Sequence, residues 1–243
     1  METVGVDVRD RPEGGPSGLL VASGVGKIYR SSAQEVVALR DVSISIRRGE
    51  FLAVMGPSGS GKTTFLNCLS GLDEIDAGSV LVDGVDVHRM SDAKRSRYRA
   101  KHMGFIFQAF NLIPVFTAAE NVELPLLLAG APPREARTRA EETLERVGLG
   151  DRKGHRPNEL SGGEQQRVTI ARALAGSPSI VWADEPTGNL DTETAASVMD
   201  LLHELNRDGL TLVLVTHDPA IGSSAQRLIR MRDGEIESGG RGH

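Results

Sequence analysis

One nine-residue stretch constrains this chain more than any other. Residues 56–64 read GPSGSGKTT, follow the apolar run 51–55 and precede a second apolar run that ends at Gly71. This spacing, between a buried strand and a helix, is the phosphate-binding loop pattern G-x-x-x-x-G-K-[ST] in the structural context that the pattern requires. A Gly/Ser-rich linker is the alternative interpretation, and the strand before the loop and the helix after it disfavour it.

Each residue type in this loop has a physical reason to be there. The glycines let backbone N–H groups approach phosphate oxygens that a Cβ would obstruct, and the helix N-terminus adds unpaired donors and the positive end of its dipole. Lys62 can reach β- and γ-phosphates, and the Thr63 hydroxyl can bind Mg²⁺. The candidate phosphate site consists of Gly56, Pro57, Ser58, Gly59, Ser60, Gly61, Lys62, Thr63 and Thr64.

Length and composition limit the number of domains and the classes of partner that this chain can have. A chain of 243 residues is long enough for one large domain or two small ones. Its net charge of −5 gives no support to nucleic-acid binding through a basic surface. The single Cys68 excludes an internal disulfide and fits a reducing compartment, where we expect it to be a small buried residue rather than a reactive thiol. No run approaches the ~18 apolar residues that cross a bilayer, so we expect any membrane connection to come through a partner chain.

Hydrophobic periodicity predicts the order of strands and helices. Apolar runs predict strands at 19–29, 42–46, 51–55, 104–108, 180–183 and 210–215, and hairpins at 79–87 and 228–236, with the strand 19–29 at a sheet edge. Helical spacing predicts helices at 91–101, 117–128, 133–147, 162–175 and 194–206. Because helices alone fill the range of about 113–177, the pattern indicates a helical insert within an α/β core. We expect a disordered tail at 1–18 and a flexible one at 239–243.

Two further constellations carry chemistry. The strand 180–183 ends in Asp184 and Glu185, where an open parallel sheet binds its ligands. Asp184 there can hold Mg²⁺ directly or through water, and Glu185 can orient and deprotonate an attacking water, the alternative being two solvated acids in a loop. Ser161, Gly162 and Gly163 open a helix and form a second anion site, the alternative being an ordinary N-cap.

Taken together and in this order, the motifs from 19 to 237 resemble those of the nucleotide-binding subunits of ABC transporters. Residues 160–165 resemble the LSGGQ signature, with Glu164 where many members have Gln, and 188–191 resemble the D-loop, with Asn189 where others have Ala. The other matching residues are the Q-loop Gln108, the Walker B pair Asp184 and Glu185, the D-loop Asp191, the switch His217 and the adenine-stacking Tyr29.

The resemblance implies a fold and roles for these residues. The fold is α/β: a RecA-like P-loop NTPase core with an antiparallel β subdomain and an inserted α-helical subdomain, the whole cassette spanning 19–238. The implied catalytic residues are Lys62, Gln108, Glu185 and His217. The implied Mg²⁺ ligands are Thr63, Gln108 and Asp184. The implied ATP contacts are Tyr29, the loop 56–64 and, in a head-to-tail homodimer that encloses two ATP, Ser161, Gly162, Gly163 and Asp191 of the second subunit.

Single residues keep simpler alternatives. Gln108 can be a surface residue, Tyr29 edge packing, His217 a turn cap and Asp191 an N-cap. For Trp182 we expect no functional role.

The stretch 107–114, followed by 120–128, is similar to a subgroup that contains lipoprotein-releasing, macrolide-exporting and cell-division ATPases. Membership implies an FtsX-like permease as partner, with four membrane helices and a large outer domain, and a cytoplasmic location on the inner face of the membrane. Residues 124–128 are then either helix core or a groove for a cytoplasmic helix of the permease. An amino-acid importer ATPase and a non-transport ABC switch are the alternatives.

Overall fold

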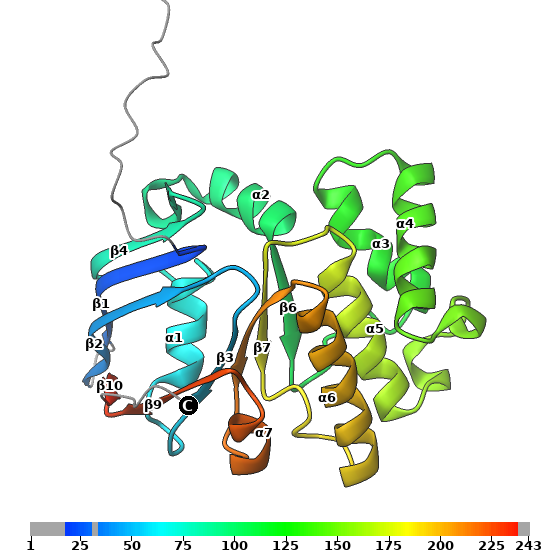
Figure 1. The fold of residues 1–243 in the computed structure, drawn as a ribbon. Helices are drawn as coiled ribbons and strands as arrows, with labels where there is room; N and C mark the ends of the chain where they lie inside the picture. The colour runs from blue at the N-terminus through cyan, green and yellow to red at the C-terminus, as the bar shows by residue number, and fades with distance from the viewer. Residues whose placement is uncertain (1–17, 31–33, 238–243) are drawn as a thin grey trace, which may run out of the picture.

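The computed structural model describes residues 18–30 and 34–237, which form two sheets with helices around them (Figure 1). The tails expected at 1–18 and 239–243 lie outside the described residues, apart from Gly18. Within the described ranges, every helix is too short or too polar to cross a bilayer.

A mainly parallel sheet forms the centre of the molecule, in the strand order β10-β9-β3-β8-β7-β6. Its strands are β3 (Phe51–Met55), β6 (Met103–Phe107), β7 (Ile180–Asp184), β8 (Thr211–Val215), β9 (Arg227–Arg232) and β10 (Glu235–Glu237). Strands β3, β7 and β8 are buried along almost their whole length, as near-continuous apolar runs are when both faces of a parallel sheet are covered. Only β10 runs antiparallel to its neighbour β9.

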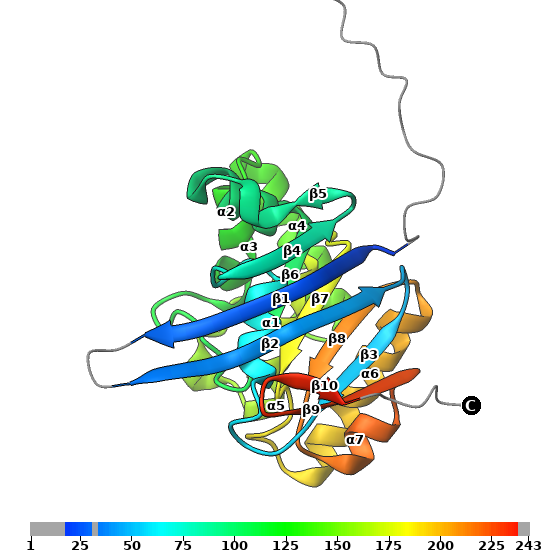
Figure 2. The ribbon, with the colours of Figure 1, turned by 90° about the vertical axis from the view of Figure 1, so that its left-hand side faces the viewer.

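An antiparallel sheet in the order β2-β1-β4-β5 covers one side of the molecule (Figure 2). It consists of β1 (Leu20–Arg30), β2 (Glu35–Ile46), β4 (Ala77–Val82) and β5 (Val85–Asp86). Helix α1 (Lys62–Leu69) lies between the two sheets and buries Phe65, Leu66, Cys68 and Leu69. Trp182 on β7 joins the same hydrophobic cluster, fully buried.

Two expectations about this sheet were wrong. The strand 19–29 was expected at an edge, yet β1 pairs with β2 on one side and with β4 on the other. Its pairing with β2 carries register shifts after Ala22, Val25 and Lys27, so an interior strand tolerates its polar residues at bulges. Strand β2 begins at Glu35, ahead of the predicted 42, and its first residues are exposed and lack apolar alternation.

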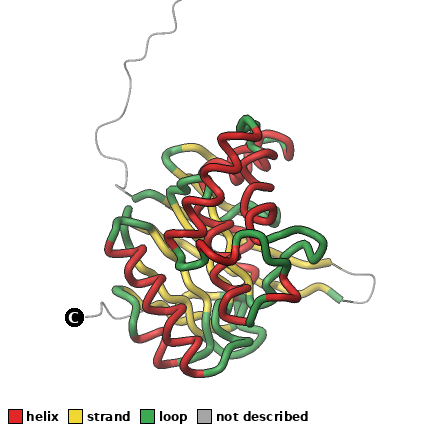
Figure 3. Tube along the Cα trace, turned by 90° about the vertical axis from the view of Figure 1, so that its right-hand side faces the viewer, coloured by secondary structure: helices red, strands yellow, loops and turns green. Residues whose placement is uncertain are grey.

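The remaining helices flank the parallel sheet. They are α2 (Asp92–His102), α3 (Ala118–Leu128), α4 (Pro133–Arg146), α5 (Gly162–Leu174), α6 (Thr192–Arg207) and α7 (Pro219–Ser223), with 3₁₀ turns at η1 (Val87–Arg89), η2 (Gly150–Arg152) and η3 (Pro157–Glu159). Helices α3, α4 and α5 pack together on one side of the molecule (Figure 3) and share a core with α6. They lie inside the range 113–177 predicted for the insert. Helix α7 and the 3₁₀ turns are too short to show a period in the sequence.

The observed arrangement confirms the predicted fold class, with an antiparallel sheet, a P-loop α/β core and a helical insert. Parallel strands end at one edge of their sheet, so the loops after β3, β6, β7 and β8 meet there. Helix α5, which precedes β7 in the chain, runs antiparallel to the strands. It therefore begins at the same edge, which is the lower edge of Figure 1.

Candidate nucleotide site

The loop 56–61 turns tightly from β3 into α1. Gly61 is the N-cap of α1 with φ 97°, and a Cβ on it would lie 2.6 Å from the Ala38 carbonyl oxygen. A Cβ on Gly56 would collide with the Met231 carbonyl oxygen, so both positions require glycine. No side chain caps α1, which leaves the N–H groups of its first turn available to an anion.

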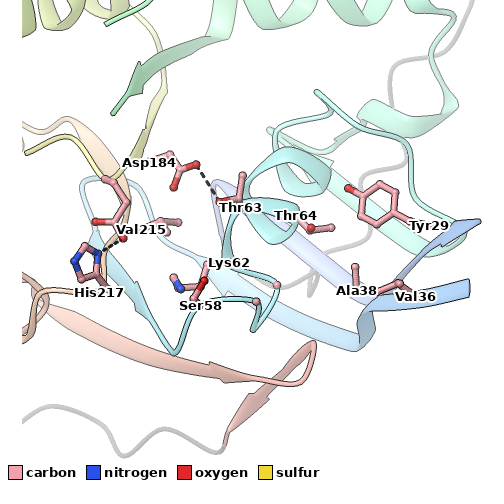
Figure 4. A pocket seen from close by; sticks show the side chains of 13 residues that line it. Tyr29, Val36, Ala38, Ser58, Lys62, Thr63, Thr64, Asp184, Val215 and His217 are labelled. Atoms are coloured by element: carbon pink, nitrogen blue, oxygen red, sulfur yellow. Dashed lines mark hydrogen bonds and ion pairs between the residues drawn. The ribbon is translucent and has the colours of Figure 1, made fainter. Parts of the chain in front are cut away.

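A cavity of about 450 Å³ opens on this loop (Figure 4). Its lining combines loop residues with the ends of β1, β2, β7 and β8, namely Tyr29, Val36, Ala38, Ser58, Gly59, Gly61, Lys62, Thr63, Thr64, Asp184, Glu185, Val215 and His217. Sequence reasoning missed Val36, Ala38 and Val215, which are small apolar residues without a recognisable pattern. Gly56, Pro57 and Ser60 form the loop behind this lining.

Lys62 lies across the concave side of the loop. Its ammonium donates to the carbonyl oxygens of Gly56, at 2.8 Å, and Pro57, at 3.0 Å. These bonds hold a positive charge within the cavity at the place where the sequence predicts phosphate groups.

Two oxygen-bearing side chains that can bind a metal ion meet beside the lysine, those of Thr63 and Asp184. The Thr63 hydroxyl donates to Asp184 Oδ2 at 3.1 Å. Burial raises the pKa of Asp184, and the Thr63 bond opposes this rise. A hydroxyl and a carboxylate are ligands that Mg²⁺ accepts, and Mg²⁺ is usually bound by one or two such groups together with water and phosphate oxygens. The described residues contain no cluster of three or more His, Cys, Asp or Glu able to hold a metal.

Glu185 is held in an unusual backbone conformation. Its φ is 48°, a left-handed value that is rare for residues other than glycine, and its N–H donates to the Val215 carbonyl at 2.9 Å. Its carboxylate accepts a 2.7 Å hydrogen bond from His217 Nδ1 (Figure 4). Backbone strain of this kind clusters at functional sites.

Gln108 does not line the cavity in this structure. Its amide donates to Asn189 Oδ1 at 3.3 Å, and the Asn189 amide donates back to the Gln108 carbonyl at 2.9 Å. The sequence marked Asn189 only as a departure from alanine. It gave no sign of these two hydrogen bonds between residues 81 positions apart.

Tyr29 lies at the end of the cavity away from His217 (Figure 4). Its hydroxyl donates to Asp73 Oδ2 at 2.7 Å, and the Lys27 ammonium lies 5.0 Å from its ring centroid. Burial raises the pKa of Tyr29, with the Asp73 bond adding to the rise. The ring is therefore fixed in place while 41% of the residue stays exposed, as a stacking platform requires.

The residues predicted to form a second anion site lie apart from the cavity and form an N-cap, the simpler interpretation of this segment. Ser161 caps α5 by accepting from the Glu164 N–H at 3.3 Å, and Glu164 accepts from the Ser161 N–H at 2.8 Å. Arg152 pairs with Glu164 at 3.0 Å, which explains how Glu suits this position. Ser161, Gly162 and Gly163 do not contribute to the cavity lining of their own chain.

Asp191 has the role that its simpler interpretation gave it. It is the N-cap of α6 and accepts from the Thr194 N–H at 2.9 Å and the Thr194 hydroxyl at 2.6 Å. A contact with ATP stays a prediction for this residue.

The fold and the site define a P-loop nucleotide-hydrolysing cassette. Residues 39–188 match the family model described as ABC transporter, and the chain belongs to this family as one of its ATP-hydrolysing, ATP-binding cassettes.

Known relatives cover most of this chain. It is 51% identical over 213 residues to an uncharacterized ABC transporter ATP-binding protein of Thermotoga maritima, spanning 88% of this chain and 91% of that protein. It is 48% identical to the lipoprotein-releasing system ATP-binding protein LolD of Syntrophus aciditrophicus, over 86% of this chain and 95% of that one. It is 46% identical to the macrolide export ATP-binding/permease protein MacB of Rhodopseudomonas palustris, covering 88% of this chain but 33% of MacB.

Among solved structures, the chain is similar to the ATP-binding cassette MJ0796, a dimer in a post-hydrolysis state bound to ADP and Pi. The TM-score is 0.83 and the identity 43%, over 91% of this chain and 98% of that chain.

Proposed function

We propose that two copies of this chain form a head-to-tail dimer that hydrolyses ATP and drives a membrane permease of the export or lipoprotein-release type. The observation that carries the dimer is the separation of the two anion sites. The loop 56–64 and Ser161 lie at the same edge of the fold, but Ser161 is not part of its own chain's cavity. A second copy facing the first supplies the missing donors to each site. The dimeric cassette MJ0796 and the relatives LolD and MacB support this reading.

In this proposal each residue has a task that its position supports. The first-turn amides of α1 and the Lys62 ammonium bind the phosphates, and the Tyr29 ring stacks on the adenine. Thr63 and Asp184 would hold Mg²⁺, with Gln108 joining them after it leaves Asn189, and the ion would supply positive charge beside the phosphates. Glu185 orients the attacking water and accepts its proton, and His217 fixes the Glu185 carboxylate and lies where it can reach the γ-phosphate.

Closing the dimer gives these contacts their strength. The N-terminus of α5, with Ser161, Gly162 and Gly163, faces the triphosphate of the other copy and excludes water from it. Fixed donors in such a dry site stabilise developing negative charge more than they do in water.

The permease interface is expected on the helical side of the molecule. The end of α3 exposes Leu127 and Leu128, whereas Leu126 is buried in the core. A cavity of about 280 Å³ lies between α2, β6 and α5, with Phe105 and Phe107 in its lining. These apolar surfaces suit an amphipathic cytoplasmic helix of an FtsX-like permease, which would hold the cassette at the inner face of the membrane.

Replacing Glu185 by Gln tests the hydrolytic mechanism. The amide keeps the side chain's shape but cannot accept the proton, so we expect ATP hydrolysis to fall by about 10²–10⁴-fold. ATP should remain bound and trap the dimer, measured by size exclusion with and without Mg·ATP. Turnover close to that of the unmodified protein would remove Glu185 from the role of base.

A further inference from the structure

A fully buried glutamine in α5 has no part in the mechanism above. Gln166 is 0% exposed, and burying a carboxamide is unfavourable unless its polar atoms are paired. Its amide donates to the Pro186 carbonyl, and the Thr169 hydroxyl shares its one proton between Gln166 Oε1, at 3.0 Å, and the Gln166 main-chain carbonyl, at 2.8 Å. Thr169 is itself buried, so the carboxamide is fixed in one orientation.

The group that Gln166 holds is the backbone next to the proposed base. Pro186 follows Glu185 directly and is buried, and because proline has no N–H its carbonyl is its one backbone group for hydrogen bonding. Glu185 needs such support, since its left-handed backbone, φ 48°, is strained. The backbone of Glu185 is also held by its N–H bond to Val215 and by the bond that its carbonyl accepts from the Gly188 N–H at 3.1 Å.

Packing around Gln166 ties the same two segments together. A Cβ on Gly163 would collide with the Thr194 methyl group, and one on Gly162 would lie 3.5 Å from Leu190 Cδ2. The first turns of α5 thus contact the segment 186–194 at three successive points. Close-packed contacts of this kind transmit displacement rather than absorb it.

We propose that Gln166 is a positioning residue, which aligns Glu185 for hydrolysis and links the helix α5 to it. This inference rests on the proposed function, in which Glu185 is the base and the N-terminus of α5 binds the triphosphate of the second copy. Ser161 then responds to one ATP while Glu185 acts on the other. Through Gln166, a shift of α5 when Ser161 binds one ATP changes the position of Glu185 at the other ATP.

The test measures steady-state hydrolysis and ATP affinity of the full chain with Gln166→Met, which keeps length and volume but cannot donate. Small misplacements of a catalytic group reduce the rate steeply, so we expect kcat to fall about 10- to 100-fold while KM and the Kd for ATP stay within about twofold. An unchanged kcat overturns the proposal. So does a parallel loss of kcat, ATP affinity and Tm, because that result means a purely structural role.

A second variant tests the hydrogen bond itself. In Gln166→Glu the carboxyl can donate to the Pro186 carbonyl only when protonated, and burial favours that form. We expect its kcat to exceed that of Gln166→Met at pH 6 and the advantage to shrink as the pH rises to 8.5. A Glu variant no better than the Met variant at any pH overturns the assigned bond.

A matched control removes hydrogen bonds far from the site. Gln226 accepts from the Phe51 N–H at 3.2 Å and donates to Asn206 at 3.1 Å, at the opposite end of β3. Gln226→Met should change Tm but not kcat. Glu185→Gln distinguishes a failure of the role of Gln166 from a failure of the proposed function. An inactive Glu185→Gln with a normal Gln166→Met rejects only the role of Gln166, and an active Glu185→Gln rejects the proposed function.

Discussion

At the scale of single residues, Cys68 illustrates how burial sets chemistry. It lies on the inner face of α1 with no exposed surface, and burial raises the pKa of its thiol to about 12, with the charge of Asp73 adding to the shift. The thiolate is the reactive form of cysteine, so at neutral pH almost none of it is present. The sequence already favoured a small buried residue at this position.

We therefore expect Cys68 to resist labelling by a thiol reagent in the native protein and to react fully in denaturant.

The pH dependence of the free energy of unfolding follows from the same pKa shift of Cys68. The unfolded chain ionises Cys68 near pH 9 and the folded chain only near 12, so its contribution to stability is present below about pH 9 and is lost between the two values. Denaturant titrations from pH 8 to 11, compared with Cys68→Ala, measure this. Rapid labelling of the native protein would contradict the expected protection of the Cys68 thiol.

At the scale of elements, the loop after β6 and the loop after β7 are joined by Gln108 and Asn189. The Asn189 amide bond goes to the Gln108 main-chain carbonyl, so only the 3.3 Å bond to Asn189 Oδ1 holds the Gln108 side chain. A neutral hydrogen bond contributes about 0.5–1.5 kcal/mol, and this one stabilises the side chain outside the cavity by that amount. Gln108 has to leave Asn189 before it can reach Mg²⁺ in the proposed mechanism. The bond between these loops thus opposes the active arrangement.

Asn189→Ala removes both side-chain bonds without touching Gln108. We expect basal ATP hydrolysis to rise, by up to about tenfold for each 1.4 kcal/mol that the bond to the Gln108 side chain had contributed. Measured turnover that stays the same or falls would mean that the bond does not limit Gln108. Gln108→Ala provides the control, because Asn189→Ala should have no effect in its background.

Elements also show where sequence reasoning succeeds and fails. The strand 51–55 and a glycine loop after it were predicted correctly, although α1 begins at Lys62 inside the predicted loop 56–64. A buried run and a glycine pattern are local properties of the chain. The interior place of β1 and the exposed start of β2 were not, because strand order and pairing depend on distant segments. The same reason hid the contacts of Gln108 with Asn189 and of Gln166 with Pro186, which join residues far apart in sequence.

At the scale of the whole molecule, the proposed function gives the cassette one face for its second copy and another for the permease. The carboxyl ends of the parallel strands and the N-terminus of α5 form the first (Figure 1). The end of α3 belongs to the second in this proposal, and residues 124–128 divide between the core and the surface. Leu126 is 3% exposed and belongs to the core, whereas Leu128 is 73% exposed and contacts solvent. An exposed leucine beside a second one at the end of a helix is the kind of surface that a partner covers.

Leu128→Glu tests this division of the surface. A charge at an exposed site leaves the fold intact, so Tm and basal ATP hydrolysis should stay unchanged, whereas burying the carboxylate against an apolar partner helix is unfavourable. We expect the co-expressed permease to be lost from pull-downs and its stimulation of ATP hydrolysis to disappear. Val85→Glu is the matched control, since Val85 is also an exposed apolar residue, at 41%, but lies on β5 in the antiparallel sheet. Equal loss of the permease with both variants would place the interface elsewhere, because a charge far from α3 would then be as harmful as one upon it.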